Sequence, residues 1–297
     1  MMKNIVVTGA TGFVGSNLVR FLLKKNFKIY VILRTDSNIS NLSDIENEVE
    51  IFRYDNQIGY LIDFFNLVQP ITVFHLASNF IAEHESHQID SLIQSNITFG
   101  LHLLEAMKVS GVKQLINTGT SWQHYNNEDY NPVCLYAATK QAFESLIEYY
   151  VQAKGFKVIT LKLFDTYGET DTRPKLINLL NKFADEKIEL NMSPGEQFLN
   201  LVHIDDVCEA FYVGSKLIDT KDYHGCHYYA VSNDRNYKLK EVIELFEKVS
   251  GKKIKVIWGG KPYRKREVMT VWNKGFGLPN WKPSITLEEG LTRYKLK

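Results

Sequence analysis

Three side chains in the middle of the sequence have types and spacings suited to acid–base chemistry. Tyr136 and Lys140 are four residues apart in a segment with a strong helical pattern, and Thr120 precedes them at the end of an apolar run. Residues four apart share one face of a helix, so we expect the ammonium to lower the tyrosine pKa from about 10 towards neutrality. With Thr120 orienting a carbonyl oxygen, the three side chains could exchange a proton with that oxygen while a hydride moves.

A Tyr-x-x-x-Lys spacing is also common on helix surfaces, so its meaning depends on the start of the chain. An apolar run, Asn4–Thr8, leads into glycines spaced G-x-x-G-x-x-G and then into an amphipathic segment that ends near Lys25. A strand, a glycine loop and a helix N-terminus in this order suit a dinucleotide pyrophosphate, because backbone amides can approach it closely. The predicted contacts in this loop are Gly9, Thr11, Gly12, Phe13, Val14 and Gly15.

The second predicted strand, residues 28–33, ends at Arg34 and Thr35, where a dinucleotide fold holds the adenosine ribose. Sites selective for NAD usually present a carboxylate there, whereas an arginine pairs with the 2′-phosphate of NADP. We therefore predict NADPH as the cofactor in preference to NADH. The alternative is that Arg34 faces solvent and has no part in cofactor choice.

Further apolar runs alternate with helical patterns through the first half of the chain. The predicted strands are residues 48–54, 71–77, 114–118 and 157–164, and the predicted helices include residues 96–108 and 136–154. This alternation predicts an α/β fold, a doubly wound and mostly parallel Rossmann sheet with helices on both faces. The loops after the third and fourth strands should meet the cofactor through Asp55 and through Leu76, Ala77 and Ser78.

The pattern changes after Phe164 and predicts a smaller, mixed α/β lobe that folds over the dinucleotide domain. We expect the dinucleotide domain to span residues 1–164 with about 199–222, and the substrate lobe to span residues 165–198 and 223–297. The predicted elements here are helices over 176–185 and 238–249, strands over 199–204 and 227–231, a helix to Leu217 capped by Asp205, and a Thr286-x-x-Glu289 capping box.

Composition restricts the classes of partner. The 297 residues carry a formal net charge of +1, and 23% of them are charged, so nothing indicates binding to nucleic acid or to an anionic membrane. The three cysteines are far apart in the sequence, as reduced thiols are. Without a basic leader or an apolar run of membrane length, we expect a cytoplasmic protein that binds a small molecule.

The helices predicted at 96–108 and 136–154 carry more apolar side chains than one contact with a sheet would cover. In the second of them, Ile147 lies on the side of Tyr136, while Leu146 and Tyr149 extend round another face. We therefore expect a homodimer formed through these two helices, since two-fold interfaces are the commonest kind. A loop that covers the surplus surface is the alternative.

These motifs together resemble the extended short-chain dehydrogenase/reductases that act on nucleotide sugars, within the NAD-dependent epimerase/dehydratase family. Besides the glycine loop and Tyr136-x-x-x-Lys140, the resemblance covers nearly the full length. It includes the motifs Ile71-Thr-Val-Phe-His-Leu-Ala77, Asn96-x-x-x-Gly100, Leu163-Phe-Asp-Thr-Tyr-Gly168, Val202-His-Ile-Asp-Asp206 and Trp281-Lys-Pro with Leu287-Glu-Glu-Gly. Residues 117–124, 135–142 and 173–176 are most similar to reductases that act on the 4-keto group of CDP-linked sugars.

The resemblance implies a role for each site residue. Tyr136 would donate a proton to the sugar 4-oxygen while NADPH reduces carbon 4, and Lys140 would hold the nicotinamide ribose. Thr120 would bond the reacting oxygen, or Ser121 if the strand register differs by one. Asn96 and Thr118 would lie at the cofactor. The implied substrate is a CDP- or dTDP-linked 4-keto-6-deoxy or 3,6-dideoxy hexose, and the product would serve lipopolysaccharide O-antigen or other surface polysaccharide synthesis.

Two departures from the family patterns bear on the reaction and on the substrate. Dehydratases of the family follow the catalytic threonine with Asp-Glu, but Ser121-Trp122 stand here, which argues against dehydration. Many relatives place an arginine for the pyrophosphate where this chain has Leu199-Asn200. Another cation must then replace it, and the candidates, each otherwise a surface charge, are Arg173, Lys175, Arg264 and Arg266.

Asp165 and Thr166 follow the last strand of the first domain and would face the substrate. Relatives often have an asparagine in the position of Asp165. A carboxylate there would accept a bond from a sugar hydroxyl or cap the following turn, and the sequence leaves both roles open.

Other functions remain open from the sequence. An epimerase would use the same three catalytic residues with a resident NAD(P), and a non-catalytic protein could keep the NADP-binding fold. The pairs His84-x-x-His87 and His203-x-Asp205 each lack a third ligand, so no metal site is predicted. No G-x-S-x-G elbow of a hydrolase is present. The sequence determines neither the nucleotide nor the configuration of the product at carbon 4.

Overall fold

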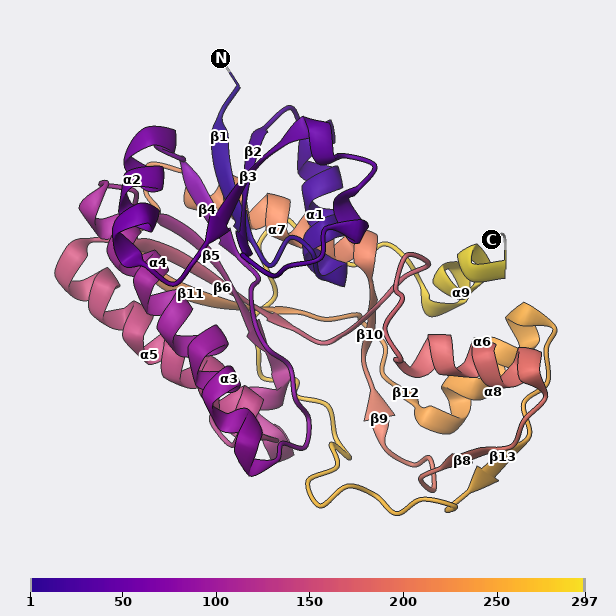
Figure 1. Cartoon of the computed structure of the whole chain (residues 1–297). Helices are drawn as coiled ribbons and strands as arrows, with labels where there is room; N and C mark the ends of the chain where they lie inside the picture. Colours follow the sequence, from indigo (N-terminus) through magenta and orange to yellow (C-terminus); the bar gives the residue numbers. More distant parts are fainter. Residues whose placement is uncertain (1, 296–297) are drawn as a thin grey trace.

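The computed structural model, which describes residues 2–295, is built around a seven-stranded parallel sheet (Figure 1). The strand order is β11-β6-β5-β4-β1-β2-β3, so the chain reverses its direction of growth between β1 and β4. The strands are β1 (Asn4–Thr8), β2 (Lys28–Arg34), β3 (Val49–Tyr54), β4 (Thr72–His75), β5 (Gln114–Thr120), β6 (Lys157–Leu163) and β11 (Gly225–Val231). The central strands are buried on both faces, and the predicted doubly wound α/β fold is confirmed.

Helices cover both faces of this sheet (Figure 1). One face carries α1 (Phe13–Lys24) and α7 (Ile204–Ile218), and the other carries α2 (Ile58–Val68), α4 (Phe99–Val109) and α5 (Leu135–Lys154). The helix predicted from residue 96 begins earlier, because α3 (Ile89–Ile93) and a π-helical turn, Gln94–Thr98, run directly into α4. Helix α2 is not among the helices predicted from the sequence.

Helices α4 and α5 approach each other closely at a glycine. A Cβ at Gly100 of α4 would overlap the ring of Phe143 on α5. Phe143 is fully buried and also packs against His75 at the end of β4, with ring centroids 5.1 Å apart. The glycine therefore sets the distance between two helices that flank the end of the sheet.

The smaller lobe has its own apolar core, which α6, α8 and α9 share with short strands (Figure 1). Its elements are β7 (Asp165–Tyr167), α6 (Leu176–Glu186), β8 (Leu190–Met192), β9 (Phe198–Leu199), β10 (Leu201–His203), β12 (Tyr237–Lys238), α8 (Leu239–Ser250), β13 (Val256–Trp258) and α9 (Leu287–Lys295). The strand predicted over 199–204 is interrupted at Asn200. The Asn200 amide bonds to the carbonyl of Asn233 and the side chain of Asn236 at 2.9 and 2.8 Å, which ties two segments of the lobe together.

Two details of the predicted organisation are corrected. The sequence-based boundary placed residues 223–297 in the smaller lobe, but β11 pairs with β6 and completes the edge of the large sheet. The cap of α7 is His203 rather than Asp205, since His203 Nδ1 accepts from the amide of Asp205 at 3.2 Å. The capping box of Thr286 and Glu289 is confirmed, with reciprocal bonds of 2.8 and 3.2 Å.

The C-terminal segment is fastened to the start of α7. The carboxylate of Asp206 accepts from the amide and hydroxyl of Ser284, at 3.0 and 2.7 Å, and from the amide of Ile285 at 3.0 Å. The indole of Trp281 donates to the Asp206 carbonyl at 3.0 Å. The chain thus returns from the smaller lobe to the larger one. None of the described helices is both long and apolar enough to span a membrane.

Candidate active site

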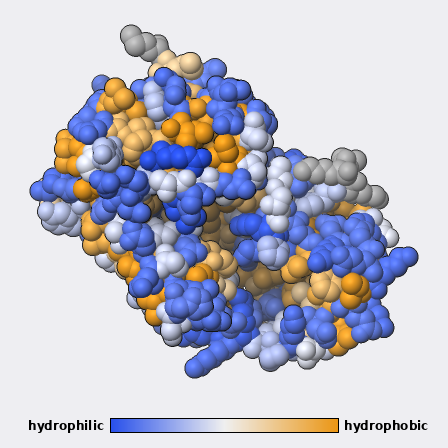
Figure 2. All heavy atoms as spheres, in the orientation of Figure 1, coloured by the Kyte–Doolittle hydropathy of each residue, from blue (hydrophilic) through white to orange (hydrophobic). Residues whose placement is uncertain are grey.

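A cleft of about 1050 Å³ lies between the two lobes, and Figure 2 shows the surface hollowed there. It opens at the carboxyl ends of β1, β2, β4, β5 and β6, which is where parallel α/β sheets bind ligands. Most of the predicted site residues line it. They are Gly9, Thr11, Gly12, Phe13, Val14, Gly15, Arg34, Leu76, Ala77, Ser78, Thr118, Thr120, Ser121, Tyr136, Asp165, Thr166, Arg173 and Lys175.

The glycine loop is shaped so that only glycines fit at two of its positions. Gly9 has φ +70°, and a Cβ there would lie 2.6 Å from the amide nitrogen of Ala77. A Cβ at Gly15 would overlap the carbonyl of Gly9. Gly12 caps α1 without a side-chain bond, so the first amides of the helix remain directed at the cleft. This cradle suits a pyrophosphate and supports the predicted dinucleotide site.

At the adenosine end of the cleft, the side chain of Arg53 bonds to the backbone of the loop that carries Arg34. Arg53 of β3 donates to the carbonyls of Arg34, Thr35 and Ser37 at 3.1, 3.1 and 3.2 Å. Arg34 is 75% exposed at the rim and lies 3.4 Å from the Asp36 carboxylate. Ser37 lines the cleft here and Thr35 does not, so the contact at Thr35 stays a prediction.

Asp55 does not line the cleft either. Its carboxylate accepts from the amide and side chain of Gln57 at 3.1 and 3.2 Å, just before α2. Its neighbour Asn56, with φ +70°, lines the cleft in its place. Nothing in the sequence indicates that Asn56 lines the cleft in place of Asp55, because this depends on the left-handed backbone turn at Asn56.

The corner after β4 is held by buried polar side chains. The Thr8 hydroxyl accepts from the amide of Ala77 at 3.2 Å and lies 2.8 Å from Nδ1 of His75. Burial, aided by Lys140, lowers the pKa of His75 to about 3, so its ring is neutral. Asn96, which was predicted to contact the cofactor, does not line the cleft. Its amide is buried outside the cleft and bonds to the backbone of Asn79 at 2.6 and 3.0 Å, which positions the corner instead.

Thr120 and Tyr136 both line the cleft. The hydroxyl of Thr120 accepts from the amide of Trp122 at 3.3 Å, so its proton is available to a ligand oxygen. The buried hydroxyl of Thr118 has no hydrogen-bond partner in the part of the chain that the structure describes. Lys140 lies beneath, 2% exposed, one helical turn after Tyr136.

The direction of the Tyr136 pKa shift is opposite to the sequence-based expectation. Burial raises the pKa of Tyr136 to about 12, and a hydrogen bond with Ser78 only partly opposes this. Burial also lowers the pKa of Lys140 to about 8, because its charge is removed from water. The phenol is therefore neutral in the free protein, which suits a proton donor rather than a base.

Two aromatic residues that the sequence analysis did not assign to the site form a wall beside Tyr136. Phe80 packs edge-on against Tyr136, and its ring centroid lies 5.5 Å from that of Trp122. The ammonium of Lys175 lies over Phe80 at 4.2 Å, and the guanidinium of Arg264 over Trp122 at 5.2 Å. Cations of the smaller lobe thus face an aromatic surface of the larger one across the cleft.

The four basic candidates differ in how they are held. Arg173 donates to both carboxylate oxygens of Asp171 at 2.8 Å, and Arg264 is bound to Glu267 in the same bidentate way. Arg266 lies outside the cleft. Lys175 lines it at the N-cap of α6, and within residues 2–295 no carboxylate pairs with its ammonium.

The loop that follows Thr120 is fastened by a segment of the smaller lobe. Arg266 donates to Asn131 and stacks over Tyr125 at 4.2 Å, which explains why it does not reach the cleft. Asn127 and Asn273 exchange two hydrogen bonds of 2.8 and 3.1 Å. Arg264 is likewise absent from the lining, since Glu267 holds it against Trp122.

Asp165 is accessible from the cleft, and enclosure between the lobes raises the pKa of its carboxyl group while Lys175 and Arg264 oppose the shift.

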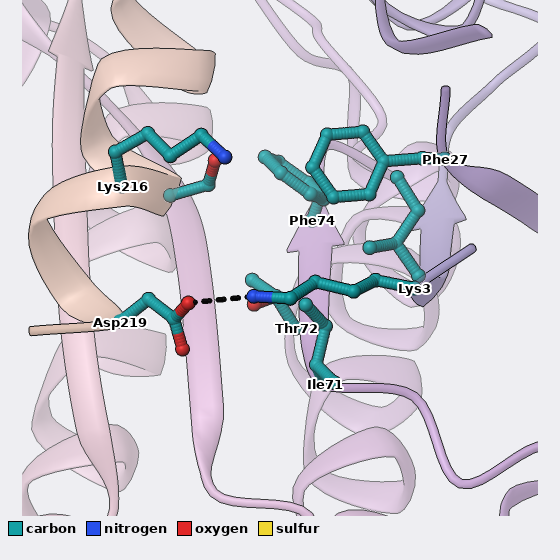
Figure 3. A pocket seen from close by; sticks show the side chains of 9 residues that line it. Lys3, Phe27, Ile71, Thr72, Phe74, Lys216 and Asp219 are labelled. Carbon is teal, nitrogen blue, oxygen red and sulfur yellow. Dashed lines mark hydrogen bonds and ion pairs between the residues drawn. The ribbon is translucent and has the colours of Figure 1, made fainter. Parts of the chain in front are cut away.

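No cluster of metal-ligating side chains occurs among the described residues. A second hollow, of only about 10 Å³, lies at the amino ends of β1 and β4 (Figure 3). The ion pair of Lys3 and Asp219, 2.9 Å long, crosses it, and it has room for about one water.

Comparisons with known proteins agree with this geometry. Residues 5–229 match the model of the NAD dependent epimerase/dehydratase family. A CDP-abequose synthase of Yersinia pseudotuberculosis is 28% identical, over 89% of this chain and 90% of that protein. A UDP-glucuronate 4-epimerase of Thermodesulfobacterium geofontis is also 28% identical, over 98% of this chain and 95% of that protein.

A solved UDP-glucose 4-epimerase of Stenotrophomonas maltophila, with bound NAD and a UDP-linked sugar, has the same fold. It superimposes with a TM-score of 0.87 over 99% of this chain and 97% of its own, at 17% identity. The similarity in fold therefore includes both lobes.

Proposed function

The chain belongs to the NAD dependent epimerase/dehydratase family, and from this we propose that it reduces the 4-keto group of a nucleotide-linked 4-keto-6-deoxy or 3,6-dideoxy hexose with NADPH. The observation that carries the proposal is that the neutral phenol of Tyr136 and the free hydroxyl proton of Thr120 line one cleft with the glycine cradle. A ketone that is reduced needs a proton donor at its oxygen, and this arrangement supplies one.

Each side chain has a separate role in the proposed reduction. Thr120 donates to the sugar 4-oxygen and orients it, and Tyr136 transfers its proton to that oxygen as carbon 4 is reduced. NADPH, when bound, supplies the hydride. Lys140, directly below, holds the nicotinamide ribose and supports the phenolate that remains. Phe80 and Trp122 exclude water from the reacting centre.

The rim of the cleft supports the proposal of NADPH rather than NADH. Arg34 and Ser37 both line the cleft here, and Arg53 donates to the backbone carbonyl of each. A guanidinium and a hydroxyl there suit a 2′-phosphate. A cofactor that leaves oxidised after each turnover also fits a reductase.

For the substrate pyrophosphate, the cleft favours Lys175. It combines an ammonium that no described carboxylate holds with the free amides at the start of the 11-residue helix α6, and both attract a diphosphate. Arg173 and Arg264 would first have to leave their carboxylates. We propose a CDP- or dTDP-linked sugar, and the similarity to CDP-abequose synthases favours CDP.

An epimerase that keeps its own cofactor is the second candidate, favoured by the similarity to a protein named UDP-glucuronate 4-epimerase. The decisive experiment follows the NADPH absorbance with CDP- and dTDP-linked 4-keto-6-deoxyglucose and the CDP-linked 3,6-dideoxy analogue. Stoichiometric loss with one of them supports the reductase and identifies its nucleotide. No loss, with a new sugar isomer by NMR, supports the epimerase.

We also propose a homodimer formed through α4 and α5. Leu101 and Val109 of α4 and Tyr149 of α5 are 37, 51 and 57% exposed, although they are large apolar or aromatic side chains. Light scattering of the purified protein, with Leu101→Glu and Val109→Glu together as the test, should show conversion of a dimer to a monomer.

A further inference from the structure

A buried ion pair lies behind the strand that carries Thr118 and Thr120. Lys162 of β6 donates to both carboxylate oxygens of Glu144 on α5, each at 2.8 Å. The two side chains are only 4% and 2% exposed. A Cβ at Gly119 would lie 2.7 Å from Cδ of Lys162 and 3.0 Å from Oε1 of Glu144. The glycine between the two threonines therefore makes room for this pair.

The same carboxylate is within reach of a second lysine. Glu144 follows Lys140 by one helical turn on α5, the spacing at which opposite charges pair along a helix. Lys140 is fully buried, and within residues 2–295 no hydrogen bond or ion pair holds its ammonium. Two buried lysines thus compete for one carboxylate, and the lysine from the strand occupies both of its oxygens.

We propose that Lys162 is a positioning residue of the active site: by engaging both oxygens of Glu144, it prevents Lys140 from pairing along α5 and leaves that ammonium free for the cofactor ribose. This inference rests on the proposed function in so far as Lys140 holds the ribose. Without Lys162, the Glu144 carboxylate would be buried without a partner, and Lys140 is the cation placed to pair with it.

The other titratable groups around this cluster do not compete with Glu144 for pairing with Lys140 or Lys162. The titratable side chains facing the pair and Lys140 are His75 of β4, His124 after β5, Tyr136 of α5, and Cys226 and Tyr228 of β11. Burial raises the pKa of the thiol and of both phenols and lowers that of both imidazoles, so all five are neutral near pH 7. The charge of the exposed Glu148, one helical turn after Glu144, also acts on Cys226 and Tyr228, and the Glu148 carboxylate accepts from the side chain of Gln152 at 2.7 Å. Among the described groups facing the cluster, Glu144 is therefore the buried carboxylate within reach of both lysines.

The first test is NADPH affinity, measured by fluorescence titration at mildly acidic pH. Lys162→Met should weaken binding about tenfold or more, as expected for a lost charge-assisted hydrogen bond. The double variant Glu144→Gln/Lys162→Met removes the carboxylate that would capture Lys140, so its affinity should return to within about twofold of the parent, the scatter of independent substitutions. Glu144→Gln alone should also bind within that range.

Lys108→Met is the matched control, because it removes a partly exposed lysine from its pair with Glu105 on α4 and should leave NADPH affinity unchanged. A double variant as weak as Lys162→Met would overturn the proposal, since the pair would then be only structural. Normal binding by Lys162→Met would overturn it as well. Melting temperatures separate a lost fold from lost affinity. If Lys162→Met does not fold, the double variant, which leaves neither charge buried alone, decides the matter: affinity about tenfold or more below the parent would overturn the proposal.

A second measurement needs neither cofactor nor substrate. In protein labelled with carbon-13 at lysine Cε, the NMR signal that Lys140→Met removes reports the titration of Lys140. Its midpoint should rise above that of the parent in Lys162→Met and fall below it in Glu144→Gln. Unchanged midpoints in both variants would refute the proposal. If the parent bound no NADPH while these shifts appeared, the proposed function would fail and the positioning of Lys140 by Lys162 would stand.

Discussion

The ring of Tyr136 meets Phe80 edge-on, with centroids 5.0 Å apart and planes at 76°. This contact and the burial that comes with it keep the phenol neutral, since burial raises its pKa to about 12. An acid that holds its proton until the substrate arrives is suited to reducing a ketone, whereas oxidising an alcohol first would require phenolate. Cofactor and substrate would bind to a protein in which the Tyr136 phenol still carries its proton.

Replacing Tyr136 by phenylalanine should leave NADPH affinity unchanged and lower kcat about 10² to 10⁴ fold, the range for a lost general acid. Stopped-flow absorbance with the ketosugar provides the measurement. Tyr60→Phe, at a 54% exposed tyrosine, is the control and should have parental activity. Near-full activity of Tyr136→Phe would contradict its assignment as the acid.

Arg34→Asp should weaken NADPH binding about 10 to 100 fold, because a charge-assisted bond to the 2′-phosphate is lost and a like charge is introduced. NADH, which has no such phosphate, should change little. Both dissociation constants can be measured by fluorescence. The exposed Arg235, which stacks on Tyr237, offers a charge-matched control in Arg235→Asp. Equal weakening of both cofactors would remove the argument for NADPH.

Lys175→Met should raise the KM for the nucleotide sugar about tenfold, since an ammonium beside a helix N-terminus is lost. The control is Arg264→Met, whose guanidinium is already held by Glu267 at 2.8 and 3.1 Å and should have the smaller effect. Calorimetric titration with CDP tests the same contact without turnover. A larger loss in Arg264→Met would move the pyrophosphate to that residue.

The pH profile of kcat/KM should have an alkaline limb set by Lys140. Its pKa is lowered to about 8, so the ammonium is present below that pH and is lost above it. Tyr136 keeps its proton to about 12 and does not limit this range. The rate should fall about tenfold per pH unit above 8. In Lys140→Arg the guanidinium does not titrate, so the limb should disappear even if the rate is lower; a limb that persists would belong to another group.

Gly100→Ala should destabilise the fold by about 1 to 3 kcal/mol, the usual cost of overpacking, because the new methyl group overlaps Phe143. Gly59, in α2, has no positive φ, and a Cβ added there would meet no heavy atom within 4 Å among the described residues. Gly59→Ala should therefore be neutral or stabilise by up to about 1 kcal/mol. Urea unfolding compares the two helices directly. Equal effects would show that α4 and α5 can separate without cost.

Much of the large domain could be predicted because its signals are local. Each strand of the parallel sheet is a short apolar run, and the glycine loop has a spacing that few other structures require. β1 was predicted to the residue, and α5 to within one residue. β11 was assigned to the wrong lobe because a strand that pairs with β6 across a long stretch of sequence carries no local sign of its partner.

The site was harder to predict where side chains interact with one another. Tyr136 and Lys140 have the predicted spacing, but the sign of the Tyr136 shift depends on how deeply Phe80 and the lobes bury it. Asn96 and Asp55, predicted to contact the cofactor, bond to Asn79 and Gln57 and do not line the cleft, while Asn56 does. The spacing of a motif indicates which residues could form a site, but only the packing of the folded chain decides which of two adjacent residues faces the ligand.

The attachment of Ser284 and Ile285 to Asp206 has a consequence for how the molecule comes apart. Asp206 belongs to the first turn of α7, which packs on the large sheet, whereas the segment it holds leads into α9 of the smaller lobe. Heat or denaturant cannot melt the smaller lobe without breaking these buried bonds. The two lobes should therefore unfold as a single cooperative unit, and a protease that cuts after Trp281 should release no stable fragment.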